Sequence, residues 1–148
     1  MFKTSVATRV ISLAVLLTLL LASFPTAVGT AKTNNPGLER KWAKLVTLYK
    51  RQAQIHNSAP RWVEWTTNNS SASKSKKAEL WKSLTTSNTV WAPVPSIAMR
   101  HNGFDANGNV VDKAAAQQSV KDLSRALQRY TKAIKNLKAL LRQLKLKV

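Results

Sequence analysis

The stretch DKAAAQQSVKDLSRALQRYTKAIKNLKALLRQLKLKV, residues 112–148, decides the fold of this 148-residue chain. Apolar residues recur in it at alternating steps of three and four, and no polar residue interrupts the row. This spacing keeps one side of an α-helix turned toward a partner. The row, called the leucine stripe below, consists of Val120, Leu123, Leu127, Tyr130, Ile134, Leu137, Leu141 and Leu144.

Residues beside the leucine stripe predict what kind of partner covers it. Ala126, Ala133 and Leu140 widen the stripe on one flank, which is more typical of a helix in a bundle than of a two-stranded coiled coil. Asp112 suits the N-cap position, and strong helix formers follow it. We therefore expect one long helix over about residues 112–146.

The opposite side of this helix is basic. After Asp122 the chain contains no acidic residue. Exposed helices usually mix the two signs of charge, which gives them support from pairs four residues apart. The basic side is therefore either the solvated surface of an alkaline protein or a surface for an anionic partner. Its candidate anion-binding residues are Arg125, Arg129, Lys132, Lys135, Lys138, Arg142 and Lys145.

The first 29 residues have the three parts of a secretory signal peptide. Lys3 and Arg9 give a basic start, residues 10–24 form an apolar run, and small residues near 29–31 suit a cleavage site. The apolar run is shorter than the roughly 20 residues that a spanning helix needs, and an uncleaved anchor is the alternative. We expect a secreted or periplasmic protein.

Composition narrows the class of the remaining domain, residues 30–148. It keeps 22 basic residues, the 24 of the whole chain less Lys3 and Arg9, against 6 acidic ones, a net charge of +16. The chain has no cysteine, so an exported domain of this size is held together by its core without disulfides. One small helical domain is expected.

Two shorter helices are predicted before the long one. The first covers about residues 38–56, with Pro36 in its first turn and Pro60 beyond its end. The second covers about 76–84. At about 1.5 Å per residue, neither helix matches the long helix in length, but placed end to end the two come close to it. The expected fold is all-α, a helical hairpin or three-helix bundle built on the C-terminal helix.

The middle of the chain is predicted to be irregular. Pro93 and Pro95 favour an extended path, and Asn107-Gly108 suits a type I′ turn in a small β-hairpin. A polar linker holds two overlapping N-glycosylation patterns, at Asn68 and Asn69.

Trp62 and Trp65 allow two interpretations. Tryptophan is highly buried on average, which favours core anchors. The alternative is a platform on which sugars or bases stack.

Catalytic and metal signatures are absent from the sequence. There is no H-E-x-x-H, G-x-S-x-G, phosphate-binding glycine loop or cysteine nucleophile. Glu64 is the best acid candidate, but no second carboxylate can be assigned to face it. Asp105, Asn107 and Asn109 match the start of a calcium loop, whose later ligands are missing. The sequence predicts neither enzyme nor cofactor.

Three functions remain open. The first is an exported binding or structural protein that engages an anionic cell-envelope polymer, acidic polysaccharide or extracellular nucleic acid. The second is a cationic helical protein lying on an anionic membrane surface. The third is a module whose leucine stripe pairs with another protein or a second copy. The first is preferred because the stripe suits burial within the chain. No small-molecule substrate is indicated.

Overall fold

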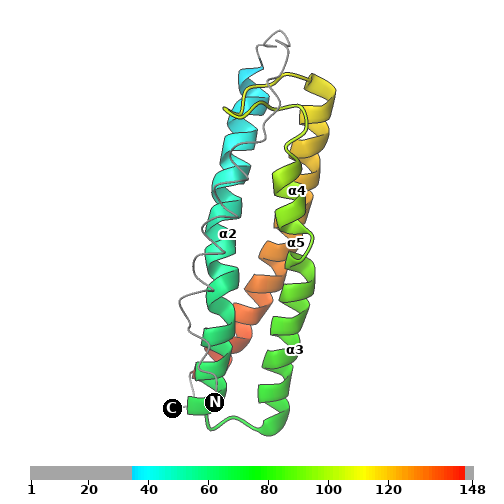
Figure 1. Cartoon of the computed structure of the whole chain (residues 1–148). Helices are drawn as coiled ribbons and strands as arrows, with labels where there is room; N and C mark the ends of the chain where they lie inside the picture. Colours follow the sequence, from blue (N-terminus) through cyan, green and yellow to red (C-terminus); the bar gives the residue numbers. More distant parts are fainter. Residues whose placement is uncertain (1–34, 146–148) are drawn as a thin grey trace, which may run out of the picture. The chain divides into compact units, whose positions relative to one another are not determined.

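The computed structural model describes residues 35–145, with side chains through Leu144. The predicted signal peptide lies outside the described residues. Four helices make up this part of the chain (Figure 1): α2 (Pro36–Asn69), α3 (Lys74–Trp91), α4 (Val94–Arg100) and α5 (Lys113–Lys145). No strand occurs within residues 35–145, so the predicted all-α bundle with a long C-terminal helix is confirmed.

Helix α2 is much longer than the sequence suggested. The predicted stop near His56 is wrong, because the helix continues through Pro60 to Asn69. Residues at alternating four- and three-residue steps from Leu38 to Ser70 are all buried or half-buried, with polar members among them. An interior proline costs about 3 kcal/mol. Beyond it, Val63 and Thr66 are buried at 0% and 1% exposure, and their packing offsets this cost.

Helices α3 and α4 lie end to end. α3 exceeds the predicted 76–84 at both ends, and its N-cap Ser73 accepts a hydrogen bond from the Lys76 amide at 3.4 Å. The predicted extended path at Pro93 and Pro95 is also wrong. Both prolines stand at the start of α4, where a missing N–H costs no helical hydrogen bond. Together, α3 and α4 therefore flank much of α5.

The loop between α4 and α5 packs against the start of α2 and forms a hydrogen bond with it. Phe104 stacks on Trp42 with ring centroids 4.7 Å apart, and the Val110 amide donates to Glu39 Oε1 at 3.2 Å. Phe104 and Val110 form one isolated antiparallel bridge. The predicted type I′ turn is wrong, because that turn needs a positive φ at both Asn107 and Gly108, and only Gly108 has one.

Gly103 is required where this loop meets α5. Its φ is +83°, and a Cβ there would lie 2.2 Å from the Ala116 amide nitrogen. A larger residue would push the loop off the helix. Asp112 then caps α5, its Oδ1 accepting from the Ala115 amide at 3.1 Å. The helix begins at Lys113, as the sequence predicted.

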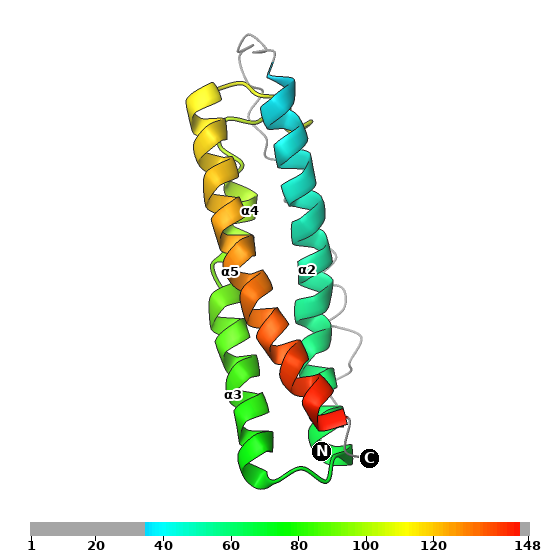
Figure 2. The same ribbon diagram turned by 180° about the vertical axis from the view of Figure 1, so that it is seen from behind.

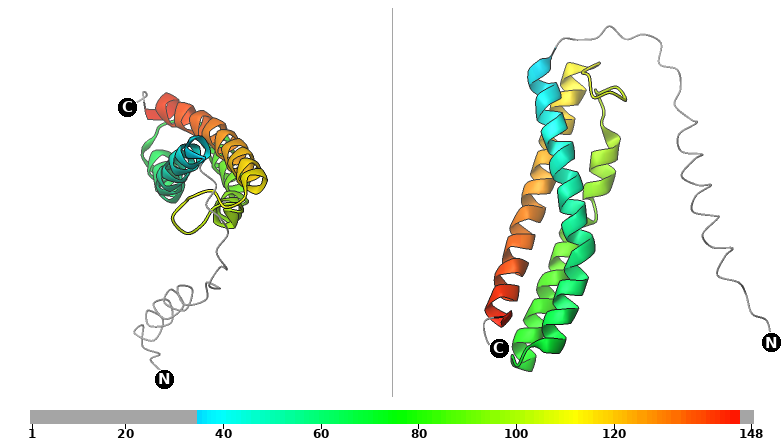
Figure 3. Two further views of the ribbon diagram at one scale, coloured as in Figure 1. Left: turned by 90° about the horizontal axis from the view of Figure 1, so that it is seen from above. Right: turned by 90° about the vertical axis from the view of Figure 1, so that its left-hand side faces the viewer.

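The chain runs along α2, back along α3 and α4, and forward again along α5, so that α2 and α5 are parallel (Figures 1 and 2). The buried Ser70 hydroxyl donates to the Leu144 carbonyl at 3.3 Å, joining the ends of the parallel pair. Figure 3 shows α5 beside both α2 and the α3–α4 pair. α5 thus contacts each of the other three helices described here, α2, α3 and α4.

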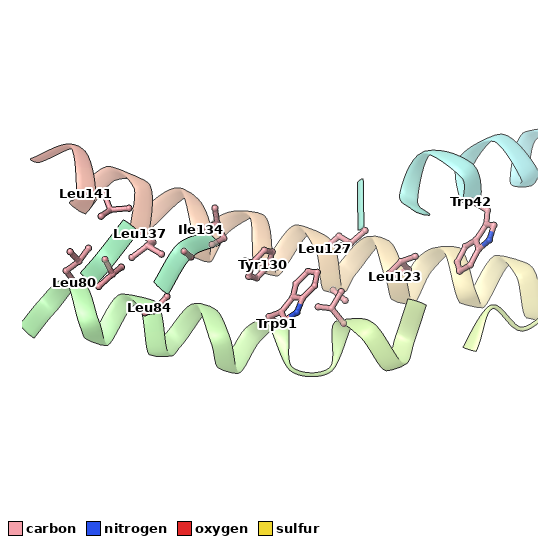
Figure 4. Close-up of a cluster of buried hydrophobic side chains, with 14 of the residues drawn as sticks. Trp42, Leu80, Leu84, Trp91, Leu123, Leu127, Tyr130, Ile134, Leu137 and Leu141 are labelled. Carbon is pink, nitrogen blue, oxygen red and sulfur yellow. The ribbon is translucent and has the colours of Figure 1, made fainter. Parts of the chain in front are cut away.

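The core lies along the inner side of α5. From Leu123 to Leu144 every member of the leucine stripe is buried, and Val120 is half-buried. Leu80 and Leu84 of α3 cover the end near Leu137 and Leu141, as Figure 4 shows. The chain's own helices therefore bury the stripe.

Aromatic rings fill the middle of the bundle. Trp91 lies 4.6 Å from the Tyr130 ring, 5.1 Å from His56 and 5.7 Å from Tyr49, measured between centroids (Figure 4 shows Trp91 and Tyr130). Burial raises the pKa of the Tyr130 hydroxyl, and it lowers the pKa of His56 below 6.5. Burial therefore favours the neutral form of both groups.

Candidate basic and aromatic surface

The basic residues of α5 divide between two sides of the bundle. Arg125 and Arg129 line a groove against α3 and α4. Lys135, Lys138 and Arg142 line grooves against α2. Lys132 is exposed and lines none of these grooves, and the side chain of Lys145 lies outside the described residues. The structure thus brings five of the seven predicted anion-binding residues together as two groups.

One groove, of about 370 Å³, lies between the ends of α2 and α5. Trp62 and Trp65 line it from α2, and Lys138 and Arg142 line it from α5. The Lys138 Nζ atom lies 5.6 Å from the centroid of the Trp62 ring. A cation at this distance from an indole face is attracted by the ring's quadrupole. Arg61 completes the basic lining.

The preferred interpretation of these tryptophans was wrong. Trp62 is 36% exposed and Trp65 is 57% exposed. By contrast, Val63, which lies between them, and Thr66, which follows them, are buried. The residues that attach this part of α2 to the core are therefore the smaller ones. Large apolar side chains that the core does not use are informative about binding.

A second groove, of about 390 Å³, continues the first toward the middle of the bundle. Lys138 and Arg142 line both grooves, so the two form one surface. We call this surface the α2–α5 strip. The residues it adds to the first groove are Leu48, Arg51, Gln52, Ile55, Tyr130, Thr131, Ile134 and Lys135.

Hydrogen bonds of the buried Gln52 side chain lie at the floor of the strip. Gln52 Nε2 donates to Thr131 Oγ1 at 2.5 Å and approaches the Leu127 carbonyl at 3.5 Å. Thr131 in turn donates to the same carbonyl at 2.8 Å. This network links α2 to α5 beneath the strip.

A third groove, of about 710 Å³, lies on the other side of α5. Arg100, Arg125 and Arg129 line it together with Asp122. Both carboxylate oxygens of Asp122 accept from Gln118 Nε2 at 2.9 Å. No tryptophan lines this groove. It therefore offers arginines and apolar walls without an indole surface on which a ring could stack.

The catalytic and metal-ligand candidates of the sequence either form hydrogen bonds within their own loop or lie away from the three grooves. Asp105 Oδ1 accepts from the Asn107 and Asn109 amides at 2.9 and 2.8 Å, so this carboxylate organises its own loop. His101 Nδ1 lies 2.6 Å from the Met99 carbonyl. Glu64 is exposed and lines none of the three grooves. Within residues 35–145 no metal-binding cluster of His, Asp and Glu occurs.

Sequence reasoning missed Arg51, Arg61 and Leu48 as members of the surface. A signal for them was present. The repeat that begins at Leu38 continues past Pro60 when its polar members are accepted, and Trp62 and Trp65 then fall outside it. Side chains outside this repeat of buried positions are expected to be exposed.

Comparison with known proteins gives no relative for this chain: no protein-family model, curated protein or solved structure matches it. Among the described helices, none is long and apolar enough to cross a membrane.

Proposed function

We propose that this protein is an exported binding protein that engages an anionic polymer along the α2–α5 strip. The observation that carries the proposal is the shape and charge of that strip. Arg51, Arg61, Lys135, Lys138 and Arg142 line it, and no acidic residue does. The proposed role is binding and not catalysis.

The length of the strip favours a polymer over a small anion. Along α2 it extends from Leu48 to Trp65, roughly 26 Å at the helical rise. A small ligand would fill one of the grooves and leave the other unused. A chain of repeating anionic units would contact the five cations in turn, and each contact would add to affinity in a salt-dependent way.

Burial of the leucine stripe disfavours the two alternatives. A helix that lies in a membrane interface or pairs with another subunit needs an apolar face to offer. In α5 that face already packs against α2, α3 and α4. The basic sides of α5 remain available, and they attract anions without unfolding the bundle.

Binding to anionic polymers at increasing salt concentration tests this function. Neutralising Arg51, Lys135, Lys138 and Arg142 with glutamine should weaken binding at least about tenfold, because these cations line the strip. The matched control neutralises Lys74, Lys76, Lys77 and Lys82 of α3, which removes the same charge from residues that do not line the strip.

The control variant should bind as the unmodified protein does. Equal loss in both variants would mean that net charge alone drives binding, and the strip would not be the site. Binding to anionic vesicles in preference to every soluble polymer would replace this function with the membrane alternative.

A further inference from the structure

We infer that the tryptophan end of the strip is a subsite for an acidic polysaccharide whose carboxylates are attached directly to its sugar rings, as in uronic acids. This inference rests on the proposed function, since it specifies which anionic polymer the strip binds. The subsite consists of Arg61, Trp62, Trp65, Lys138 and Arg142.

Two exposed indoles line one groove at this end of the strip. Trp62 and Trp65 line the same groove and lie about 4.5 Å apart along the helix axis. The core takes Val63 and Thr66 from this turn instead. Sugar rings present C–H groups to the negative face of an indole, so two such rings provide a surface for neighbouring units of a chain.

A cation lies close to one of the indole rings. Lys138 Nζ lies 5.6 Å from the Trp62 ring centroid, and Lys138 itself is half-buried. A ligand that stacks on Trp62 and pairs with Lys138 must therefore carry its anionic group close to the stacked ring. A uronic acid does so, because its carboxylate is bonded to the ring.

A nucleic acid suits this geometry less well. Its negative charge lies on the phosphate, and the ribose or deoxyribose separates that phosphate from the base that would stack. The cations of the subsite would then need to stand farther from the indole. Single-stranded nucleic acid is therefore the competing ligand that the experiment has to exclude.

A pair of arginines also lines the subsite. Arg61 and Arg142 are exposed and line the groove from opposite helices. A guanidinium binds a planar carboxylate through two parallel hydrogen bonds, which a lysine cannot do. The one acidic residue of this turn of α2, Glu64, does not line the groove. The subsite can thus hold carboxylates on either side of the tryptophans.

Polymers that separate charge from ring structure test the inference. The probes are polygalacturonate, poly-glutamate and oligo(dT), titrated against the unmodified protein and the double variant Trp62→Ala/Trp65→Ala. We expect the double variant to bind polygalacturonate at least about tenfold more weakly, as for loss of one or two stacked rings. Poly-glutamate, which has carboxylates but no rings, should bind both proteins equally.

Two variants serve as controls. Trp81→Ala removes an exposed tryptophan of α3, 44% exposed and outside the strip, and should leave every affinity unchanged. Trp62→Leu/Trp65→Leu keeps apolar bulk without an aromatic face, so it reports on stacking if the alanine variant folds poorly. It should lose polygalacturonate affinity to a similar degree.

The possible failures are distinguishable. Unchanged polygalacturonate affinity in both double variants would overturn the subsite and leave the charge-driven function standing. A loss confined to oligo(dT) would replace the polysaccharide with single-stranded nucleic acid. Absence of binding to all three polymers by the unmodified protein would overturn the proposed function together with the subsite.

Discussion

Tryptophan is buried at one end of α2 and exposed at the other. Near the start of the helix, Trp42 is 7% exposed and stacks on Phe104 of the loop before α5. Near its end, Trp62 and Trp65 line a groove beside Lys138, and both remain substantially exposed. The difference comes from what lies opposite. The loop packs on the first end, whereas at the second end Lys138, Leu141 and Arg142 of α5 line the opposite side of a groove.

This difference separates stability from binding within one helix. A buried tryptophan stabilises the fold through packing, and its loss leaves a cavity. An exposed tryptophan beside cations contributes little to folding and offers a surface to a ligand. The start of α2 therefore serves the structure, and its end serves the proposed function.

The largest expected effect is that of Trp42→Ala. Removal of this buried ring should lower the free energy of unfolding by about 3–5 kcal/mol, measured by urea denaturation. Trp62→Ala, the matched change at the other end, should cost less than about 1 kcal/mol, because an exposed side chain leaves no closed cavity. Similar costs at the two sites would remove the distinction between the two ends.

Pro60→Ala should stabilise the protein by about 2 kcal/mol, the cost of an interior proline less the chain entropy that proline removes from the unfolded state. Thermal and urea unfolding measure it. Pro36→Ala is the control, since Pro36 stands in the first turn of α2 and costs no helical hydrogen bond. A loss of stability in Pro60→Ala would show that the end of α2 needs the proline to reach α5.

Thr66→Val should stabilise the protein by about 1 kcal/mol. The Thr66 hydroxyl oxygen is buried without a hydrogen-bond partner among the described residues, and removing such a group recovers its desolvation cost. Thr131→Val is the matched change at a hydroxyl that does bond, to Gln52 and Leu127, and should destabilise by about 1 kcal/mol. Equal effects of the two substitutions would contradict this interpretation.

The smallest effect is a pH dependence from His56. Because burial lowers its pKa in the folded protein below the unfolded value of 6.5, the unfolded chain binds the proton more readily. Stability should therefore be complete above pH 6.5 and fall as the pH decreases below it. His56→Phe should flatten this part of the profile in unfolding measurements from pH 5 to 8. An unchanged profile would assign the dependence to other groups.

The fold was predictable where apolar residues alone mark the pattern. The leucine stripe of α5 and the Asp112 cap identify that helix and its start. In α2 the same repeat passes through Gln52, His56 and Thr66, and Pro60 lies beside it within the helix. Polar residues at core positions and a breaker inside the helix both argue against a continuous helix in sequence, and tertiary packing overrides them.

The surface was predictable only in part. Arg125 to Arg142 could be recognised as basic positions of one helix, but their division into two groups depends on where α2 and α3 pack. Trp62 and Trp65 had no certain location until the end of α2 was known. Their proximity to Lys138 joins residues distant in sequence, and no local pattern encodes it.

We propose that the exposed tryptophans of α2 bind the polymer and that the buried tryptophans do not. The five tryptophans give separate indole N–H signals in ¹H–¹⁵N spectra, assignable with single Trp→Phe variants. On titration with polygalacturonate, we expect the signals of Trp62 and Trp65 to shift, while those of Trp42, Trp81 and Trp91 stay in place. Shifts of Trp81 alone, or stationary signals of Trp62 and Trp65 in a protein that binds the polymer, would contradict it.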